Sequence, residues 1–342
     1  QISNCLSHNP NSHTSFSVLR DHSCLVGLPQ ECIEILEGHT DEVLYVAFSH
    51  DGTRLASASR DKSVVVWFAL SNGVRMEGHS GICWHVCWSP DDRHLLTCAS
   101  DNTVKCYSVE VPSCAFTFIR PESAFSLWPP IASRCSGACV NSHPGDGVRL
   151  DLKGQALFTW RDSIVQDLVV TPDGHRVVMA ATSNSIFVYN LHSKAKETQF
   201  SEQCPITSIS VSDDSKHILV STTSPPVNQF IVTHLGSAHV GFVDRHNGFI
   251  QSRYVIRATF GGSPTQSFVV SGSEDSQIYV WNRHSGELIA VLSGHSGPVN
   301  SVFWSPTAPS VPCSVGKRQG IDYVCVLASA SDDHTIRLWG YD

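Results

Sequence analysis

Short apolar runs and polar turns follow one another along most of the chain. The runs, such as residues 64–67 and 278–281, are rich in β-branched and aromatic residues, which is the composition of β-strands. The breaks between them carry turn residues such as Asp51-Gly52 and Pro90-Asp91. This pattern predicts small antiparallel meanders and an all-β protein.

Four segments of the chain repeat one template. An acidic residue lies six positions before a closing aromatic residue in all four, and Ser or Thr lies ten positions before it. The acidic residues are Asp61, Asp101, Asp275 and Asp333. The hydroxyl residues are Ser57, Thr97, Ser271 and Ser329. The closing aromatic residues are Trp67, Tyr107, Trp281 and Trp339. A Gly-His pair precedes three of the segments, with His39, His79 and His295. Two fixed offsets in four copies indicate one structural unit repeated along the chain.

The spacing of the Gly-His pairs predicts the number of units. His39 and His79 are 40 residues apart, and His79 and His295 are 216 apart, or five units of about 43. Adding the two ends gives seven units. The degenerate units in the middle of the chain span residues 115–159, 164–189 and 206–221.

A Gly-His start and a Trp end resemble the WD40 repeat, whose fold is a β-propeller of four-stranded blades. We therefore expect a seven-bladed WD40 β-propeller with some degenerate middle blades. Only three residues follow Trp339, so the last blade lacks a fourth strand. Residues 32–36, just before the first Gly-His, are the expected partner, because this pairing leaves no open sheet edge around the ring.

The expected propeller is a single domain covering residues 31–342. A flexible leader, residues 1–30, rich in Ser, Asn and His, precedes it. Three segments depart from the repeat and are expected to form irregular inserts near 110–145, 223–250 and 311–325.

The WD40 resemblance implies a role for the repeated residues. In that family the His, Ser or Thr, Asp and Trp of one blade form a buried hydrogen-bonded tetrad, which satisfies the buried carboxylate. Tyr107 should weaken the second tetrad, and Met179 and Ser183 remove it from the fourth blade. The same residue types could also form Ser-His-Asp catalytic triads. Their recurrence favours the structural interpretation, because an active site is normally built once, and we expect no catalytic residues.

Composition and charge narrow the class of partner. The net charge is −8. A negative chain as a whole does not attract nucleic acid or an anionic membrane. The longest apolar run, 64–70, has seven residues, whereas a membrane-spanning helix needs about twenty. There is no signal-peptide pattern, and most of the 13 Cys sit singly in apolar strands. We expect a reduced compartment and neither nucleic-acid nor membrane partners.

Signals for a metal or a cofactor are weak. No phosphate-binding loop, dinucleotide fingerprint or metalloprotease motif occurs in the chain. Cys135, Cys139 and His143 lack a clear fourth zinc ligand, and His234, His239 and His246 are interpreted as loop residues. We expect no metal and no cofactor.

The C-terminal third carries a more specific resemblance, in residues 253–262, 271–281 and 328–340. These residues, with 168–174 and 205–210, resemble the family of WD repeat-containing protein 26, particularly its plant-type members, over roughly 31–342. That family serves the GID/CTLH ubiquitin ligase as a scaffold and substrate-recruiting arm. The resemblance implies a non-catalytic scaffold of the cytoplasm and nucleus, with ligase subunits and degradation substrates as partners. The family's LisH and CTLH helical segments, on which oligomerisation rests, are missing from this sequence, so a monomer is expected.

Three other functions remain open at this stage. A cullin-4 substrate receptor often carries Trp-Asp-x-Arg at a blade end, but the blade ends here read Trp67-Phe68, Trp281-Asn282 and Trp339-Gly340. A transcriptional co-repressor propeller is a second alternative. A propeller hydrolase, the third, would need a single carboxylate or metal cluster at the channel.

The residue just before each tetrad Asp is the candidate for partner binding. These residues are Arg60, Ser100, Glu274 and Asp332. They lie in the expected turns between second and third strands, and such loops on a rigid scaffold commonly carry binding. Glu274 and Asp332 on nearby blades would favour a basic peptide. The alternative is that all four are ordinary solvated turn residues.

Overall fold

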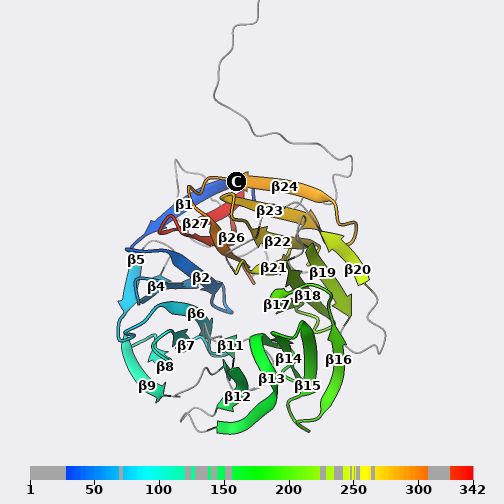
Figure 1. Cartoon of the computed structure of the whole chain (residues 1–342). Coiled ribbons are helices and arrows are strands. Elements are labelled where there is room, and N and C mark those ends of the chain that lie inside the picture. The colour runs from blue at the N-terminus through cyan, green and yellow to red at the C-terminus, as the bar shows by residue number, and fades with distance from the viewer. Residues whose placement is uncertain are drawn as a thin grey trace, which may run out of the picture.

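A computed structural model describes residues 28–68, 72–119, 125–127, 138–139, 145–150, 156–223, 229–234, 242–246, 249, 251, 255–262, 266–306 and 324–341. These residues form strands, turns and loops, and none of them is helical. The described part of the chain thus offers no helix that could cross a membrane. Its sheets stand around a common axis, as Figure 1 shows, so the all-β propeller is confirmed.

Five of the six sheets among the described residues have four strands each. The first blade contains β2 (Val43–Phe48), β3 (Arg54–Ser59), β4 (Val64–Phe68) and β5 (Asn72–Met76). The second contains β6 (Cys83–Trp88), β7 (His94–Ala99), β8 (Thr103–Ser108) and β9 (Ser113–Ile119). The fifth contains β17 (Ile206–Val211), β18 (His217–Thr222), β19 (Gln229–His234) and β20 (Phe242–His246). The sixth contains β21 (Ala258–Gly261), β22 (Phe268–Gly272), β23 (Gln277–Asn282) and β24 (Leu288–Ser293).

The last blade takes strands from both ends of the chain. It contains β25 (Val299–Trp304), β26 (Val324–Ser331), β27 (Thr335–Tyr341) and β1 (Glu31–Glu37). β1 pairs antiparallel with β27, from Glu31 opposite Gly340 to Glu37 opposite Thr335. The predicted closing strand is therefore confirmed.

The one remaining sheet among the described residues is larger, with seven strands. It contains the fourth blade, β13 (Ala156–Val170), β14 (Arg176–Ala181), β15 (Ser185–Asn190) and β16 (Lys196–Ser201). β12 (Gly145–Leu150), β10 (Phe125–Leu127) and β11 (Ala138–Cys139) extend it beyond β13. These three short strands come from the region of the expected third blade, so the count of seven blades stays a prediction at this position.

Two of the three expected inserts contain regular strands. β19 and β20 lie within 223–250 and supply the outer half of the fifth blade, although their sequence lacks the closing Trp. β9 lies within 110–145 and is the fourth strand of the second blade. The third insert, 311–325, and residues 1–27 of the expected leader lie almost entirely outside the described residues.

Burial along the strands follows from their place in a blade. In β3 and β7 the last five residues are all buried, because neighbouring blades cover both faces of these second strands. The outermost strands β1 and β16 keep most of their residues exposed or half-buried. An apolar run therefore predicts an inner strand and a mixed run predicts an outer one.

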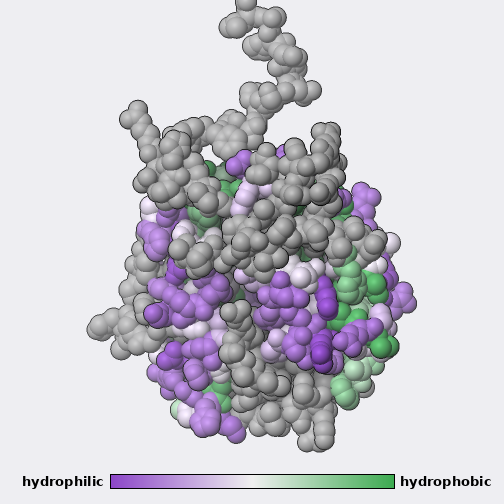
Figure 2. Space-filling view, turned by 180° about the vertical axis from the view of Figure 1, so that it is seen from behind, coloured by the Kyte–Doolittle hydropathy of each residue, from purple (hydrophilic) through white to green (hydrophobic). Residues whose placement is uncertain are grey.

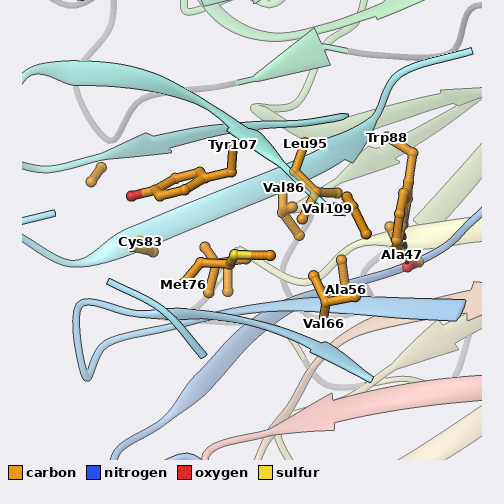
Figure 3. Packing of buried hydrophobic residues seen from close by; sticks show 13 residues of the cluster. Ala47, Ala56, Val66, Met76, Cys83, Val86, Trp88, Leu95, Tyr107 and Val109 are labelled. Carbon is orange, nitrogen blue, oxygen red and sulfur yellow. Dashed lines mark hydrogen bonds between the residues drawn. The ribbon is translucent and has the colours of Figure 1, made fainter. Parts of the chain in front are cut away.

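Apolar side chains fill the space between adjacent blades. Figure 3 shows this between the first and second blades, where Met76 and Val66 meet Cys83, Val86 and Tyr107. Each of these side chains is at most 2% exposed. In the same layer the indole of Trp88 donates to the carbonyl of Ala47 at 3.0 Å and so ties the two blades directly.

The turns between first and second strands are joined from one blade to the next. The Asp92 carboxylate accepts the backbone amides of His50 and Asp51 at 3.0 and 3.1 Å. Between the fourth and fifth blades, Ser215 Oγ accepts the backbone amide of Asp173 at 3.0 Å. Gln266 accepts the amide of Asp213 at 2.9 Å. These bonds add a polar link to the apolar packing between blades.

Candidate functional site

The last blade contains a complete tetrad. His295 Nδ1 lies 2.8 Å from Asp333 Oδ2, and its Nε2 lies 2.7 Å from Ser329 Oγ. The Trp339 indole donates to the same Ser329 Oγ at 2.8 Å. Three segments of the blade, namely the loop before β25, β26 and β27, are thus linked through one chain of hydrogen bonds.

The first blade repeats this geometry and adds an arginine. His39 lies 2.9 Å from Asp61 and 2.7 Å from Ser57, and the Trp67 indole donates to Ser57 at 2.9 Å. Arg75 Nη1 lies 3.1 Å from Asp61 Oδ2. The predicted tetrads of the first and last blades therefore have the geometry that the WD40 resemblance implied.

In the last blade the surroundings favour an ionised aspartate and a neutral histidine. Burial alone would raise the pKa of Asp333, but hydrogen bonds from His295 and Thr335 hold it well below its ordinary value. Burial lowers the pKa of His295, although Asp333 opposes this. In the second blade, donors from Thr103 and His79 outweigh burial and lower the pKa of Asp101 to about 2.

The glycine of each Gly-His pair makes room for the closing aromatic ring. A Cβ atom on Gly38 would lie 2.9 Å from the Trp67 ring, and one on Gly294 would lie 3.1 Å from the Trp339 ring. In the sequence these glycines serve only as markers of a repeat. Their close approach to the indole gives a physical reason for the pair.

The second tetrad lacks the bond from its closing aromatic residue; that this weakens the tetrad stays a prediction. His79 lies 2.9 Å from Asp101 and 2.8 Å from Thr97. The Tyr107 hydroxyl, however, is buried without a hydrogen-bond partner among the described residues. A phenol in this position fills the space of the indole but does not reach the threonine.

The sixth blade replaces the histidine by a tyrosine of its own strand. The Tyr279 hydroxyl donates to Asp275 Oδ2 at 2.8 Å. Ser271 Oγ donates to the carbonyl of Gly272 at 2.8 Å. Phe249 packs edge-on against Trp281, with ring centroids 6.1 Å apart. In the fourth blade, Met179 is 1% exposed and takes the place of the hydroxyl residue.

The His-Ser and His-Asp contacts have the connectivity of a catalytic triad, but the hydroxyls are not accessible. Ser57, Thr97 and Ser329 are each 0% exposed. Ser57 and Ser329 also accept an indole N–H. The same arrangement recurs in three blades, so its effect is to hold each blade together rather than to attack a substrate.

The turn residues proposed for partner binding are attached to the loop that precedes their blade. The backbone amides of Arg60, Ser100 and Asp332 donate to Glu42, Ile82 and Pro298 carbonyls at 2.9, 2.9 and 3.0 Å. Ser100 Oγ also accepts the Ile82 amide at 2.8 Å. Glu274 is half-buried in the turn between β22 and β23.

Two of these candidates lie together where the first and last blades meet. Arg60 Nη1 pairs with Glu42 Oε1 at 2.8 Å, and Arg60 Nε lies 4.0 Å from Asp41 Oδ2. Asn300 donates to Asp332 at 2.7 Å and to the Val43 carbonyl at 2.9 Å. Burial and the nearby Glu42 raise the pKa of Asp332. We call Asp41, Glu42, Arg60 and Asp332 the rim cluster; it has three carboxylates and one guanidinium.

A second polar cluster lies on the innermost strands and was missed by sequence analysis. Arg257 Nη1 pairs with Asp167 Oδ2 at 2.9 Å. The same guanidinium lies over the Tyr45 ring, 5.4 Å from its centroid. Tyr45 in turn packs against His85, with ring centroids 3.9 Å apart and the ring planes tilted by 34°. We call these four residues the axial cluster.

Metal and cofactor sites were not expected. Within the described ranges no three His, Cys, Asp or Glu side chains gather as a metal site would require. Cys135, His143 and His239 lie outside the described residues, as do the side chains of Cys139, His234 and His246. The absence of a metal thus stays a prediction for that part of the chain.

Comparison with known proteins agrees with this fold. The WD domain, G-beta repeat, matches residues 30–67, 72–108, 258–282 and 286–340. The chain is 36% identical to the WD repeat-containing protein WDS homolog of Arabidopsis thaliana, over 99% of this chain and 63% of that protein. It is 34% identical to the WD repeat-containing protein 26 homolog of the same plant, over 100% of this chain and 56% of that protein.

A fungal relative carries the name of a complex. The chain is 31% identical to GID complex subunit 7 of Schizosaccharomyces pombe, over 99% of this chain and 64% of that protein. The chain spans 56% to 64% of the lengths of these three relatives. It is a WD40-repeat β-propeller protein. Its homologues include proteins named WD repeat-containing protein 26 and GID complex subunit 7, as the resemblance predicted.

Proposed function

We propose that this chain is a non-catalytic scaffold that recruits substrates to a GID/CTLH-type ubiquitin ligase. The observation that carries the proposal is its similarity to GID complex subunit 7 over 99% of this chain. The propeller supports a protein-interaction role, because it presents several loops at one rim of a rigid frame. The buried hydroxyls of the tetrads support the absence of catalysis.

We propose the rim between the last and first blades as the partner surface. The rim cluster carries two more negative than positive charges, and Glu274 lies on the turn of the adjacent blade. A carboxylate-rich rim attracts a Lys- or Arg-bearing peptide and raises its association rate. Figure 2, which shows the molecule from behind, has hydrophilic side chains over much of the described surface and apolar ones along one side. The proposal also places the chain in the cytoplasm and nucleus.

Affinity purification followed by mass spectrometry tests both statements. The tagged chain should recover subunits of a GID/CTLH ligase together with basic client proteins. Recovery of a cullin-4 adaptor or a histone deacetylase in place of these subunits would overturn the proposal.

A charge-reversed variant, Glu274→Lys with Asp332→Lys, should keep the ligase subunits and lose the basic clients. The matched control is Glu110→Lys with Glu287→Lys, which makes the same charge change in turns between third and fourth strands, at the other end of the blades. Thermal melts of both variants separate lost binding from lost stability, because Asp332→Lys also removes an acceptor of the buried Asn300 amide. Equal client recovery by the two variants would remove the rim assignment.

A further inference from the structure

The axial cluster occupies one repeat position on four blades. The residue that follows this position pairs with the hydroxyl position of the tetrad. Val46 follows Tyr45 and pairs with Ser57, and Ala258 follows Arg257 and pairs with Ser271. Across the described blades this position holds Tyr45, His85, Asp167, Ser208, Arg257 and Ser301. Five of these residues lie in the first strands, and Arg257 directly precedes β21. Around the axis β13, β17, β21, β25, β2 and β6 contact one another in this order (Figure 1).

The Asp167 carboxylate is built to hold a cation. It is 2% exposed, and its Oδ1 accepts the Leu168 amide at 3.0 Å. Its Oδ2 accepts the Ile209 amide at 2.9 Å as well as the Arg257 guanidinium. Two amides alone would leave this buried carboxylate without a counter-charge, so removing the guanidinium is costly unless another cation replaces it.

The aromatic pair supplies the second element of the site. The face of Tyr45 attracts a guanidinium through the ring quadrupole. Burial and the Arg257 charge hold the pKa of His85 well below its usual value, so this imidazole is neutral. His85 therefore extends the aromatic surface and does not compete as a cation.

Arg257 enters this site from its position directly before β21, in the sixth blade. Its backbone amide donates to the Asn300 carbonyl at 2.9 Å, which fixes the start of β21 against the last blade. Burial would lower the pKa of Arg257, but Asp167 raises it, and the guanidinium stays charged. The side chain is 18% exposed, so the site borders solvent.

We propose that Tyr45, His85 and Asp167 form a guanidinium-binding site on the propeller axis and that Arg257 is its built-in occupant. While Arg257 is in place, an arginine side chain from a partner is excluded from the axis. The combination of a buried carboxylate and an aromatic face is chemistry that recognises arginine side chains. This inference does not depend on the complex that the chain joins.

The Arg257→Ala variant with methylguanidinium as the probe tests this site. The variant should bind the probe at least about tenfold more tightly than the wild type in ligand-detected NMR titrations. Its melting temperature should rise with probe concentration, because the probe binds only the folded state. Methylammonium, which has the same charge but no planar guanidinium, should have a much smaller effect.

Two further variants make the result decisive. Adding Asp167→Asn to Arg257→Ala should abolish probe binding, whereas adding Ser301→Ala, at the equivalent position of the last blade, should leave it unchanged. Equal binding by wild type and Arg257→Ala, or binding that survives Asp167→Asn, would overturn the proposal. If Arg257→Ala does not fold alone, refolding in methylguanidinium but not in methylammonium supports the site, and failure in both overturns it.

Discussion

The last and sixth blades place an aspartate at the same repeat position and satisfy it in different ways. Asp333 receives His295 from a preceding loop, as well as Thr335 and the Ser296 amide. Asp275 receives the Tyr279 hydroxyl from its own strand, only four residues away. The bond in the sixth blade is therefore local, whereas the network in the last blade joins separate segments.

This difference matches the origin of the two blades. The sixth blade is one continuous stretch of chain, β21 to β24. The last blade combines β1 with three strands from the other end of the chain. A network that ties distant segments contributes more where chain connectivity contributes less.

Removing the closing strand should give the largest effect. Deletion of residues 1–37 takes away Leu28, Ile33 and Leu36, all buried, at about 2 kcal/mol each. The melting temperature should fall by more than about 10 °C. Differential scanning calorimetry measures this fall.

Deletion of residues 1–27 is the control for this prediction, because it leaves β1 and Leu28 intact and should not change the melt. A 1–37 deletion that melts like the wild type would contradict closure by β1.

Asp333→Ala should destabilise the fold by about 1–3 kcal/mol, because it removes the acceptor of a buried network. Asp275→Ala should cost less, since among the described residues a single side-chain donor, from Tyr279, then loses its partner. Urea unfolding of both variants gives the two values. Equal losses would show that the histidine adds nothing to the last blade.

The pH dependence sharpens the same comparison. The pKa of Asp333 is lowered in the folded state, so its stabilising effect is complete above about pH 4, the ordinary carboxyl range. It is lost as pH falls from there toward the folded-state pKa, because the unfolded chain binds the proton first. Asp333→Asn should therefore show a flatter loss of stability below about pH 4 than the wild type.

Tyr107→Trp should have the smallest effect, a gain of about 1 kcal/mol. An indole N–H would supply the bond to Thr97 that the phenol does not make, as Trp67 does to Ser57 in the first blade. Tyr107→Phe is the control and should be close to neutral, because the hydroxyl it removes has no partner among the described residues. Urea unfolding measures both; a loss of stability in Tyr107→Trp would show that the second blade cannot accept the larger ring.

Sequence offsets predicted the parts of the fold that repeat. Fixed spacing located the repeated residues, and the WD40 resemblance implied both the tetrads of His39 and His295 and the fourth strand that closes the last blade. β19 and β20 were missed because backbone pairing forms them without the closing Trp that marks other blades. Tyr279 could have been found, since it lies on the same strand face as Trp281, four residues after Asp275.

The axial cluster could not be predicted in the same way. Arg257 and Asp167 lie 90 residues apart on blades that are not adjacent in sequence. Their contact depends on where each blade stands around the axis. The residue spacing within one repeat carries no information about that position. Aligning the repeats would have shown a polar column, but not which of its members meet.

β1 also has a consequence for biosynthesis. It leaves the ribosome about 300 residues before β27, so during that time it is a strand edge without its partner. Such an edge invites pairing with other chains, and charged side chains reduce that risk. Its sequence, ECIEILE, places Glu31, Glu34 and Glu37 among only three large apolar residues, and all three glutamates stay exposed in the finished ring. The acidic edge thus protects the nascent chain until β27 is available for pairing.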